Sequence, residues 1–385
     1  MRALAIAVVL LTARSAAATP RDFTAETRAV YAVAACGEAP PRAFDKRIVA
    51  AHCAELAKAV EMWRKNWLAK AQPWLAAKVD KYPRTVLYPF GGGDLVTMLA
   101  VYPDATEYTS LSLEGIGDPR PLAKLDRAKL TADLAKLRKM LAANLNWAWN
   151  MTIQLSIDSS ESGAGIPGIL TIMLVALDAH GYEPVEARYF TLNPDGTPAY
   201  LTAGVVDEWD KARPRQPKRK QTNAVQQGVF NNIELVFRKK GDPNAPKKTF
   251  RHIAADLSDD GLTANPAPLA YIAKRGDLAA MTKAASYLFW KPNFEKVRSA
   301  VLAKMKIMVS DDTGVPPRYA KPAGFTQTFY GTYNGAFFKW ASEGVRGEVE
   351  KEMIEAWKSS VEKTVPFRFG YYDNRRTPHV MITRK

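Results

Sequence analysis

The chain has 385 residues, of which 47% are hydrophobic and 24% charged, and its formal net charge at pH 7 is +15. This composition is typical of a folded globular protein and excludes a disordered or collagen-like chain. After the N-terminal residues, the longest apolar run, 166–177, contains a proline and a glycine. It is shorter than the roughly twenty residues that span a bilayer, so we predict no transmembrane segment.

The first eighteen residues have the three parts of a secretory signal peptide. Arg2 supplies positive charge, residues 3–11 are apolar, and small residues end at Ala18, after which we expect cleavage. With 1–18 as the signal peptide, the protein is expected to be exported to the periplasm or the extracellular space. Export removes it from cytosolic nucleotides and nucleic acid, so we expect neither a cofactor nor a nucleic-acid partner.

Residues 19–80 are expected to form a helical N-terminal segment. A first short helix ends near Cys36, and a second, amphipathic helix carries apolar residues from Ile48 to Trp67. The only other cysteine is Cys53, and an even number in an exported chain favours a disulfide, which would join the two helices into a hairpin. Two buried thiols are the alternative.

Residues 81–385 are expected to form one mixed α/β domain. A β-prone run at 85–88, a turn of three glycines, a helix capped by Asp94 and a strand at 107–113 make a βαβ unit, which requires a parallel pair. Short polar loops favour hairpins later in the chain, so we predict a mixed, largely three-layer sheet with flanking helices. Further strands are predicted at 185–191, 229–238, 249–257, 307–310, 325–333, 367–371 and 380–383, and further helices at 126–145, 169–180, 267–274, 277–286, 293–304 and 348–360.

Acidic residues follow several of the predicted strands. Asp94 and Glu114 follow the first two, and acidic pairs at 259–260 and 311–312 follow later ones. In open α/β sheets ligands bind beyond the carboxyl ends of the strands, so these groups are expected to gather at one edge. Carboxyl groups in different environments divide into proton donor and acceptor. The alternative is ordinary turn and helix-cap chemistry. The candidate catalytic residues are Asp94, Glu114, Asp260 and Asp312.

Several well-known motifs are missing from the sequence. It has no H-E-x-x-H and no Cys/His ligand spacing for zinc, and its acidic pairs do not follow the EF-hand order, so no metal site is predicted. The G-x-S-x-G turn of the common serine hydrolases is missing as well. The three contiguous glycines lack the G-x-G-x-x-G spacing of dinucleotide-binding folds.

Tyrosines and glycines gather near two predicted strand ends. Tyr88 and Gly92 lie around the glycine turn, and Tyr330 and Tyr333 flank a glycine and a threonine further along. Aromatic rings stack on sugar rings, so these four are candidate substrate-binding residues for an envelope glycan. Core packing is the alternative, because aromatic side chains on strands are usually buried.

Basic residues concentrate at 211–220 and again between Arg238 and Arg251. Loss of Arg2 and Arg14 with the signal lowers the net charge by two, to +13. A basic face on an exported protein would attract anionic envelope polymers or lipid headgroups. For the first run, which contains two prolines, the alternative is a solvated loop.

Five short motifs follow one another along the chain, at residues 88–94, 256–262, 285–288, 311–316 and 330–335. The set resembles a family of exported bacterial proteins that share the pattern Tyr-Pro-Phe-x-Gly-x-Asp. The resemblance extends from the strand at Tyr88 to the C-terminal strand, although at Gly93, the second variable position of the pattern, a proline is expected. It implies no activity, fold or cofactor, because none is known for the family.

Two functions follow from these features. The first is an exported cell-envelope protein that acts on an envelope glycan through an acidic and aromatic pocket. Its reaction, if it is an enzyme, would be hydrolysis by a carboxyl pair. The second function is that of a non-catalytic periplasmic or surface protein that holds an anionic envelope component on its basic face.

Overall fold

A computed structural model of the chain describes residues 19–146, 165–212, 228–286, 288–335, 345–370 and 378–385. The strands in this part of the chain form one sheet of ten, in the order β4-β3-β5-β6-β2-β1-β7-β8-β10-β9. The predicted signal peptide, 1–18, lies outside the described residues.

The sheet is parallel in its centre and antiparallel at its sides. β6, β2, β1, β7 and β8 run parallel to one another, and the other strands flank them as antiparallel neighbours. The predicted βαβ unit is confirmed, because β1 pairs with β2 in parallel and α4 connects them. The strands are β1 (Thr85–Pro89), β2 (Glu107–Ser112), β3 (Tyr182–Leu192), β4 (Pro198–Tyr200), β5 (Asn232–Lys239), β6 (Lys248–Ala254), β7 (Leu278–Thr282), β8 (Met305–Ser310), β9 (Thr326–Gly331) and β10 (His379–Arg384).

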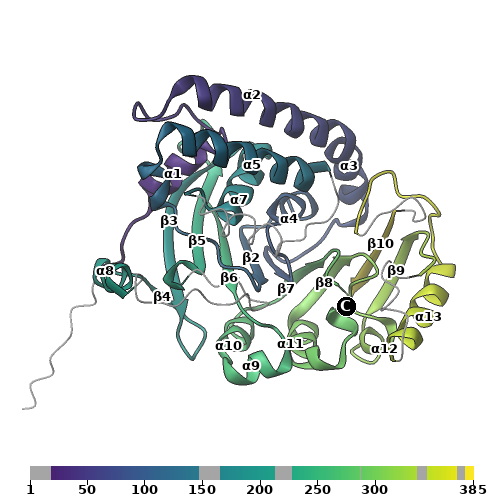
Figure 1. Ribbon diagram of the computed structural model, residues 1–385. Coiled ribbons are helices and arrows are strands. Elements are labelled where there is room, and N and C mark those ends of the chain that lie inside the picture. The colour runs from purple at the N-terminus through teal and green to yellow at the C-terminus, as the bar shows by residue number, and fades with distance from the viewer. Residues whose placement is uncertain (1–18, 147–164, 213–227, 287, 336–344, 371–377) are drawn as a thin grey trace, which may run out of the picture.

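Helices cover both faces of the sheet and complete the predicted three layers (Figure 1). One face carries α1 (Thr24–Val33), α2 (Lys46–Trp63), α3 (Ala69–Lys78), α4 (Leu95–Val101), α5 (Arg127–Asn146) and α7 (Gly168–Ala179). The other carries α9 (Asp259–Ala264), α10 (Ala267–Ala273), α11 (Glu295–Lys304), α12 (Pro317–Ala320) and α13 (Val345–Lys358), while α8 (Ala203–Ala212) lies at one side. Within the described ranges, no helix has both the length and the apolarity needed to cross a bilayer.

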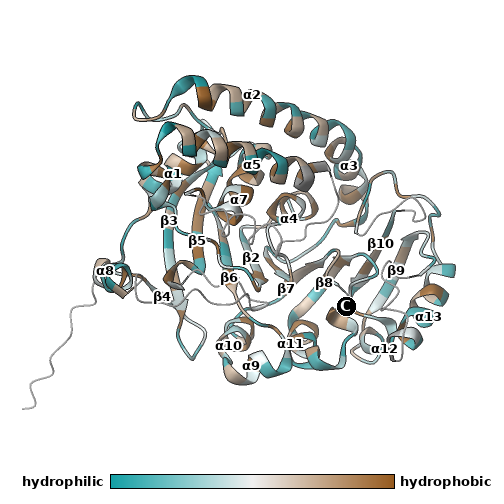
Figure 2. Cartoon of the chain, viewed as in Figure 1, coloured by the Kyte–Doolittle hydropathy of each residue, from teal (hydrophilic) through white to brown (hydrophobic). Residues whose placement is uncertain are grey.

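Alternate residues of the central strands face two different hydrophobic cores. Val86 and Tyr88 of β1 face the core beneath α4 and α7, whereas Leu87 faces the core beneath α10 and α11. Both faces of these strands are therefore covered, as a parallel sheet requires. Figure 2 shows hydrophobic and hydrophilic patches alternating along α2, as expected of a helix with one face on the core.

The N-terminal helices belong to the same core as the sheet. Cys36 and Cys53 form the predicted disulfide, which joins the chain after α1 to α2. However, α1 packs against β3 and α7, and α2 lies along α5, so the expected hairpin does not stand apart as a unit. Val30 and Leu56 share one hydrophobic cluster with Val86, which makes the N-terminal segment part of the main body.

The helix predicted at 277–286 is wrong, because this segment contains β7 in the middle of the sheet. Its alanines, leucine and methionine favour helix in isolation. In the fold, Ala279 and Ala280 lie between β1 and β8 with both faces buried, and tertiary packing overrides the local preference. A run of four apolar residues and a threonine between an Asp and a Lys has the length of a buried strand, which was the signal available in the sequence.

The strand predicted at 367–371 is not formed in its described part, 367–370. Instead, Glu362 makes a single bridge to Tyr330 of β9, and the backbone carbonyl of Arg368 accepts a hydrogen bond from Trp67 Nε1 at 2.5 Å. The segment therefore crosses beneath the N-terminal helices and does not extend the sheet. Trp67 lies in a π-helical turn, Arg64–Leu68, which the sequence does not predict.

Replacing Cys36 and Cys53 together with alanine is expected to lower the free energy of unfolding by about 3 kcal/mol, because the bridge restricts a short loop of the unfolded chain. The two cysteines are 17 residues apart in sequence. Urea unfolding followed by tryptophan fluorescence measures the loss. Chemically reduced wild-type protein should reach the same value. A loss below about 1 kcal/mol would mean that packing alone holds this region.

Candidate functional site

The carboxyl ends of β1 and β7 are the point at which the chain connections diverge. From β1 the chain passes through α4 to β2 on one side, and from β7 it passes through α11 to β8 on the other. α4 packs on α7 at one face of the sheet, and α11 packs on α10 at the opposite face. Open α/β sheets place their ligands at such a switch point. Polar side chains are buried at this point.

The first polar group at this edge is built around an ion pair. Lys283, the first residue after β7, pairs with Asp94 before α4 at 2.7 Å, and both side chains are less than a tenth exposed. Lys283 Nζ also donates to Thr97 Oγ1 at 2.8 Å, and Thr97 donates to Asp94 Oδ1 at 2.7 Å. The hydroxyl of Tyr88 donates to Asp94 Oδ2 at 3.2 Å. We call Tyr88, Asp94, Thr97 and Lys283, together with Asp311, the acid–lysine cluster.

Asp311, directly after β8, is the second carboxyl group of this cluster and is fully buried. Its oxygens accept hydrogen bonds from the backbone N–H of Ala284 at 2.8 Å and of Thr313 at 2.9 Å, and from the Thr313 hydroxyl. These donors are neutral, and within the described chain Asp311 has no cationic partner at ion-pair distance. Burial, reinforced by the charge of Asp312, raises the pKa of the Asp311 carboxyl to about 6.

Tyr88 links the two carboxyl groups. Burial, followed by the charges of Asp94 and Asp311, raises the pKa of the Tyr88 hydroxyl well above its ordinary value. The phenol is thus a neutral hydrogen-bond donor that lies within electrostatic reach of both acids. It also contacts the backbone carbonyl of Lys283 at 3.3 Å, which ties β1 to the turn after β7.

Left-handed backbone conformations concentrate at the ends of β1 and β7. Phe90, Ala284 and Ser286 have φ of 62°, 53° and 50°, and outside this edge the only other described non-glycine residue with positive φ is Cys36. Such conformations cost of order 1 kcal/mol or more and persist where the surrounding structure fixes them, often at functional sites. Here the conformation of Ala284 lets Lys283 contact Asp94 while the next N–H contacts Asp311.

Asp312 belongs to a second polar group on the opposite face of the sheet. Its Oδ1 lies 2.8 Å from His379 Nε2 at the start of β10, and both side chains are essentially inaccessible. The His379 ring lies 5.2 Å from the ring of Tyr333 and 5.3 Å from that of Trp357. We call Asp312, Tyr333, Trp357 and His379 the histidine cluster.

The predicted acidic residues are only partly brought together. Asp94 and Asp312 lie at the same edge but in different clusters, and Glu114 is buried beyond β2, where its backbone carbonyl contacts His252 Nε2 at 2.7 Å. Asp260 is exposed in the first turn of α9 and makes none of the contacts described for the two clusters. Its neighbour Asp259 caps α11, which is the alternative chemistry considered for this pair.

The predicted aromatic residues are also divided by the sheet. Tyr330 packs against Trp74 at 4.9 Å on the face of the N-terminal helices, whereas Tyr333 packs on Trp357 on the other face. Tyr88 is buried in the acid–lysine cluster. Gly92 has φ of 48° and accepts a hydrogen bond from Ser110 through its carbonyl. These four residues therefore do not line one shared surface.

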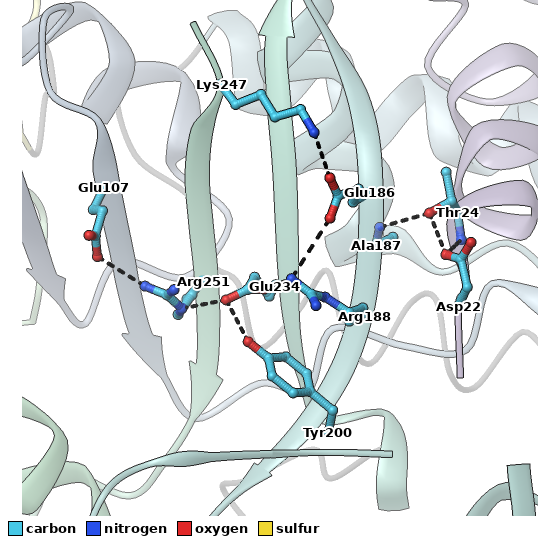
Figure 3. Close-up of polar contacts among 10 residues, drawn as sticks. All are labelled: Asp22, Thr24, Glu107, Glu186, Ala187, Arg188, Tyr200, Glu234, Lys247 and Arg251. Carbon is cyan, nitrogen blue, oxygen red and sulfur yellow. Dashed lines mark hydrogen bonds and ion pairs between the residues drawn. The ribbon is translucent and has the colours of Figure 1, made fainter. Parts of the chain in front are cut away.

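Most of the basic residues between Arg238 and Arg251 are paired with acids. Arg238 pairs with Glu183 and Lys240 with Asp178. Figure 3 shows the adjoining network, in which Lys247 contacts Glu186 at 2.7 Å. In the same view, Arg251 contacts Glu234 at 2.8 Å and Glu107 at 3.1 Å. These cations are thus neutralised locally. Most of the other basic run, 213–220, lies outside the described residues.

Sequence reasoning missed Lys283, chose Asp312 and not Asp311 as the catalytic candidate of that acidic pair, and assigned no role to His379. Lys283 was missed because its strand was predicted as a helix. Asp311 and Asp312 are both fully buried, and the sequence does not show which of the two joins the cluster around Lys283. Over the described residues, no group of three or more His, Cys, Asp or Glu side chains is arranged to hold a metal ion.

No family model, curated protein or solved structure matches the chain. The resemblance to a family of exported bacterial proteins therefore stays a prediction. Function has to be inferred from the geometry of the buried polar edge.

Replacing Asp311 with asparagine is expected to change the free energy of unfolding more favourably at pH 8 than at pH 4.5. The folded-state pKa of about 6 exceeds the ordinary value of about 3.9, so the stabilising proton is fully bound below pH 4 and is lost as pH rises through 6. Wild type should lose about 2 to 3 kcal/mol across this range, and the variant should escape this loss. Urea unfolding at several pH values, with Asp260→Asn as the exposed control, measures it. A pH-independent difference would contradict the burial argument.

Replacing Lys283 with methionine is expected to lower the free energy of unfolding by about 3 to 5 kcal/mol, because it leaves Asp94 buried without its counter-charge. The double variant Asp94→Asn, Lys283→Met should recover much of this loss, since neither charge remains. Lys58→Met, which breaks an exposed pair with Glu55, is the matched control and should have a far smaller effect. A double variant no more stable than Lys283→Met would show that shape rather than charge dominates.

Proposed function

We propose that the protein is an exported enzyme of the cell envelope that hydrolyses a glycan, with the acid–lysine cluster as its acid–base centre. The observation that carries the proposal is the contrast between two carboxyl groups around the Tyr88 hydroxyl. Asp94 is ion-paired with Lys283, whereas Asp311 has only neutral hydrogen-bond donors. Paired acids in contrasting environments are the usual basis for dividing proton donor from carboxylate.

In this proposal Asp311 is the proton donor. With a pKa of about 6, it is protonated in a useful fraction near neutral pH. It donates its proton to the glycosidic oxygen as the bond to the anomeric carbon breaks, and the sugar leaving group departs with that proton. Water then attacks the anomeric carbon and returns one proton to Asp311. The net reaction adds one water across the bond and restores the enzyme.

Asp94 supplies the carboxylate that faces the positive charge developing on the sugar ring. Lys283 and Thr97 hold both of its oxygens, so the carboxylate cannot rotate away. Tyr88 donates to the same group and is influenced by the charge of Asp311 as well. Preorganised contacts of this kind act on the transition state without a reorganisation cost.

The backbone of Gly370 covers the Asp311 carboxyl group and so restricts the access of a substrate. A methyl group placed on Gly370 would overlap the Asp311 carboxylate, so the glycine backbone lies directly on the acid. Gly370 has φ of 80°, a conformation that other residues rarely adopt. A glycan reaches Asp311 only if this backbone is displaced, which makes the segment ending at Gly370 part of substrate entry.

The disulfide and the absence, in the described chain, of a membrane-spanning helix are compatible with the predicted export. A non-catalytic protein that holds an anionic polymer is less well supported, because the basic side chains described on β5 and β6 are largely in ion pairs. Association with envelope that weakens steeply with added salt would favour that second function.

The test is an assay for new reducing ends released from isolated envelope polysaccharides and from a panel of aryl glycosides. Asp311→Asn is expected to lower turnover by about 100-fold or more, while the exposed Asp260→Asn keeps wild-type activity. Wild-type activity should fall as pH rises through about 6, because Asp311 loses the proton it must donate. The proposal fails if wild type cleaves none of these glycans, or if Asp311→Asn cleaves them as well as wild type.

A further inference from the structure

Two consecutive carboxyl groups, Asp311 and Asp312, are directed to opposite faces of the sheet. Side chains alternate along β8, with Val309 in the core that contains Tyr88, and Ser310 paired in register with Met381 on the other face. The contacts continue this alternation, because Asp311 meets Ala284 and Asp312 meets His379. One dipeptide thus contributes an acid to each polar cluster.

Only one of the two carboxyl oxygens of Asp312 has a hydrogen-bond partner in the described part of the chain. Its Oδ1 contacts His379, but its Oδ2 is buried without a hydrogen-bond partner in the described part of the chain. The nearby hydroxyls of Thr282 and Ser310, which are neighbours in register, are likewise buried without partners there. A buried carboxylate with so little hydrogen bonding depends strongly on the protonation of a basic neighbour, which for Asp312 is His379 among the described residues.

The groups that face Asp311 and His379 come from several neighbouring elements. Around Asp311 they are Tyr88 of β1, Asp94 before α4 and Lys283 after β7. Around His379 they include Asp312 after β8, Tyr333 after β9 and Trp357 of α13. Glu350, a buried carboxyl group of α13, lies against Gly335. Lys283 is paired with Asp94, whereas His379 is paired with Asp312, next to Asp311 in the chain.

We propose that Asp312 and His379 form a positioning pair, which controls how readily Asp311 takes up and releases a proton across the end of the sheet. This inference rests on the proposed role of Asp311 as proton donor. Neither residue of the pair contacts the bond that is cleaved. Protonated His379 neutralises Asp312 and eases ionisation of Asp311, whereas neutral His379 leaves Asp312 as a like charge that opposes it.

The two partners should therefore shift the titration of Asp311 in opposite directions. Charges on Asp312 and His379 act on the Asp311 pKa with opposite signs, and Asp312 is the stronger of the two. Asp312→Asn is expected to lower the Asp311 pKa by about one unit, because the like charge is gone. His379→Gln is expected to raise it, because only the opposing acid remains. A role in folding alone would not produce shifts of opposite sign.

The measurement is a carbon-13 NMR titration of aspartate carboxyl groups, with the Asp311 resonance identified by its loss in Asp311→Asn. His52→Gln is the matched control, since His52 is also fully buried and contacts a backbone carbonyl, and it should leave the Asp311 titration unchanged. If either variant does not fold, the titration of the wild-type protein by itself tests the proposal. Asp311 should then titrate in two steps, one of them at the midpoint of the His379 ring.

Opposite shifts, or a two-step wild-type curve that shares the His379 midpoint, support the pair. Unchanged or same-direction shifts, or a single-step curve independent of His379, overturn it. No substrate is needed, so the outcome is separable from the glycan assay. If the protein hydrolyses glycans but the Asp311 pKa shifts are not seen, only the positioning pair is refuted. If the pKa shifts are seen without hydrolysis, only the proposed function is refuted.

Discussion

The ion pair between Asp94 and Lys283 is the contact on which the polar edge of this sheet depends. It joins the residue that begins α4 to the residue that follows β7, at the point where the chain connections diverge. Desolvation offsets much of the attraction in a buried pair, so such a contact fixes geometry more than it adds stability. Lys283 also brings the next N–H, of Ala284, onto Asp311. One pair therefore aligns the ends of β1, β7 and β8.

The same edge carries several departures from ordinary packing and backbone geometry. The two large hydrophobic cores are filled by apolar side chains, and the described strands pair in one sheet. At the edge, Ala284 and Ser286 adopt left-handed conformations, and the Ser310 hydroxyl and Asp312 Oδ2 are buried without partners in the described chain. Local costs of this kind are expected where a protein is built for chemistry, because the surrounding structure can absorb them.

The sheet also separates features that a sequence places side by side. Asp311 and Asp312 are adjacent in the chain but lie in different clusters, and Tyr330 and Tyr333 pack in different cores. This separation gives each acid its own environment while their charges still interact. The basic residues of β5 and β6 are likewise less distinctive in the fold than in the sequence, because acidic neighbours across the strands neutralise them.

The sequence by itself determined the α/β class, the first βαβ unit, the disulfide and the presence of acidic residues after the central strands. These depend on local signals: hydrophobic period, glycine turns, cysteine number and the polarity of strand ends. Only the tertiary structure decided that 277–286 holds a central strand, that Lys283 pairs with Asp94, and that Asp260 stays exposed. Those outcomes depend on burial and on contacts between distant segments, and neither is encoded in local spacing.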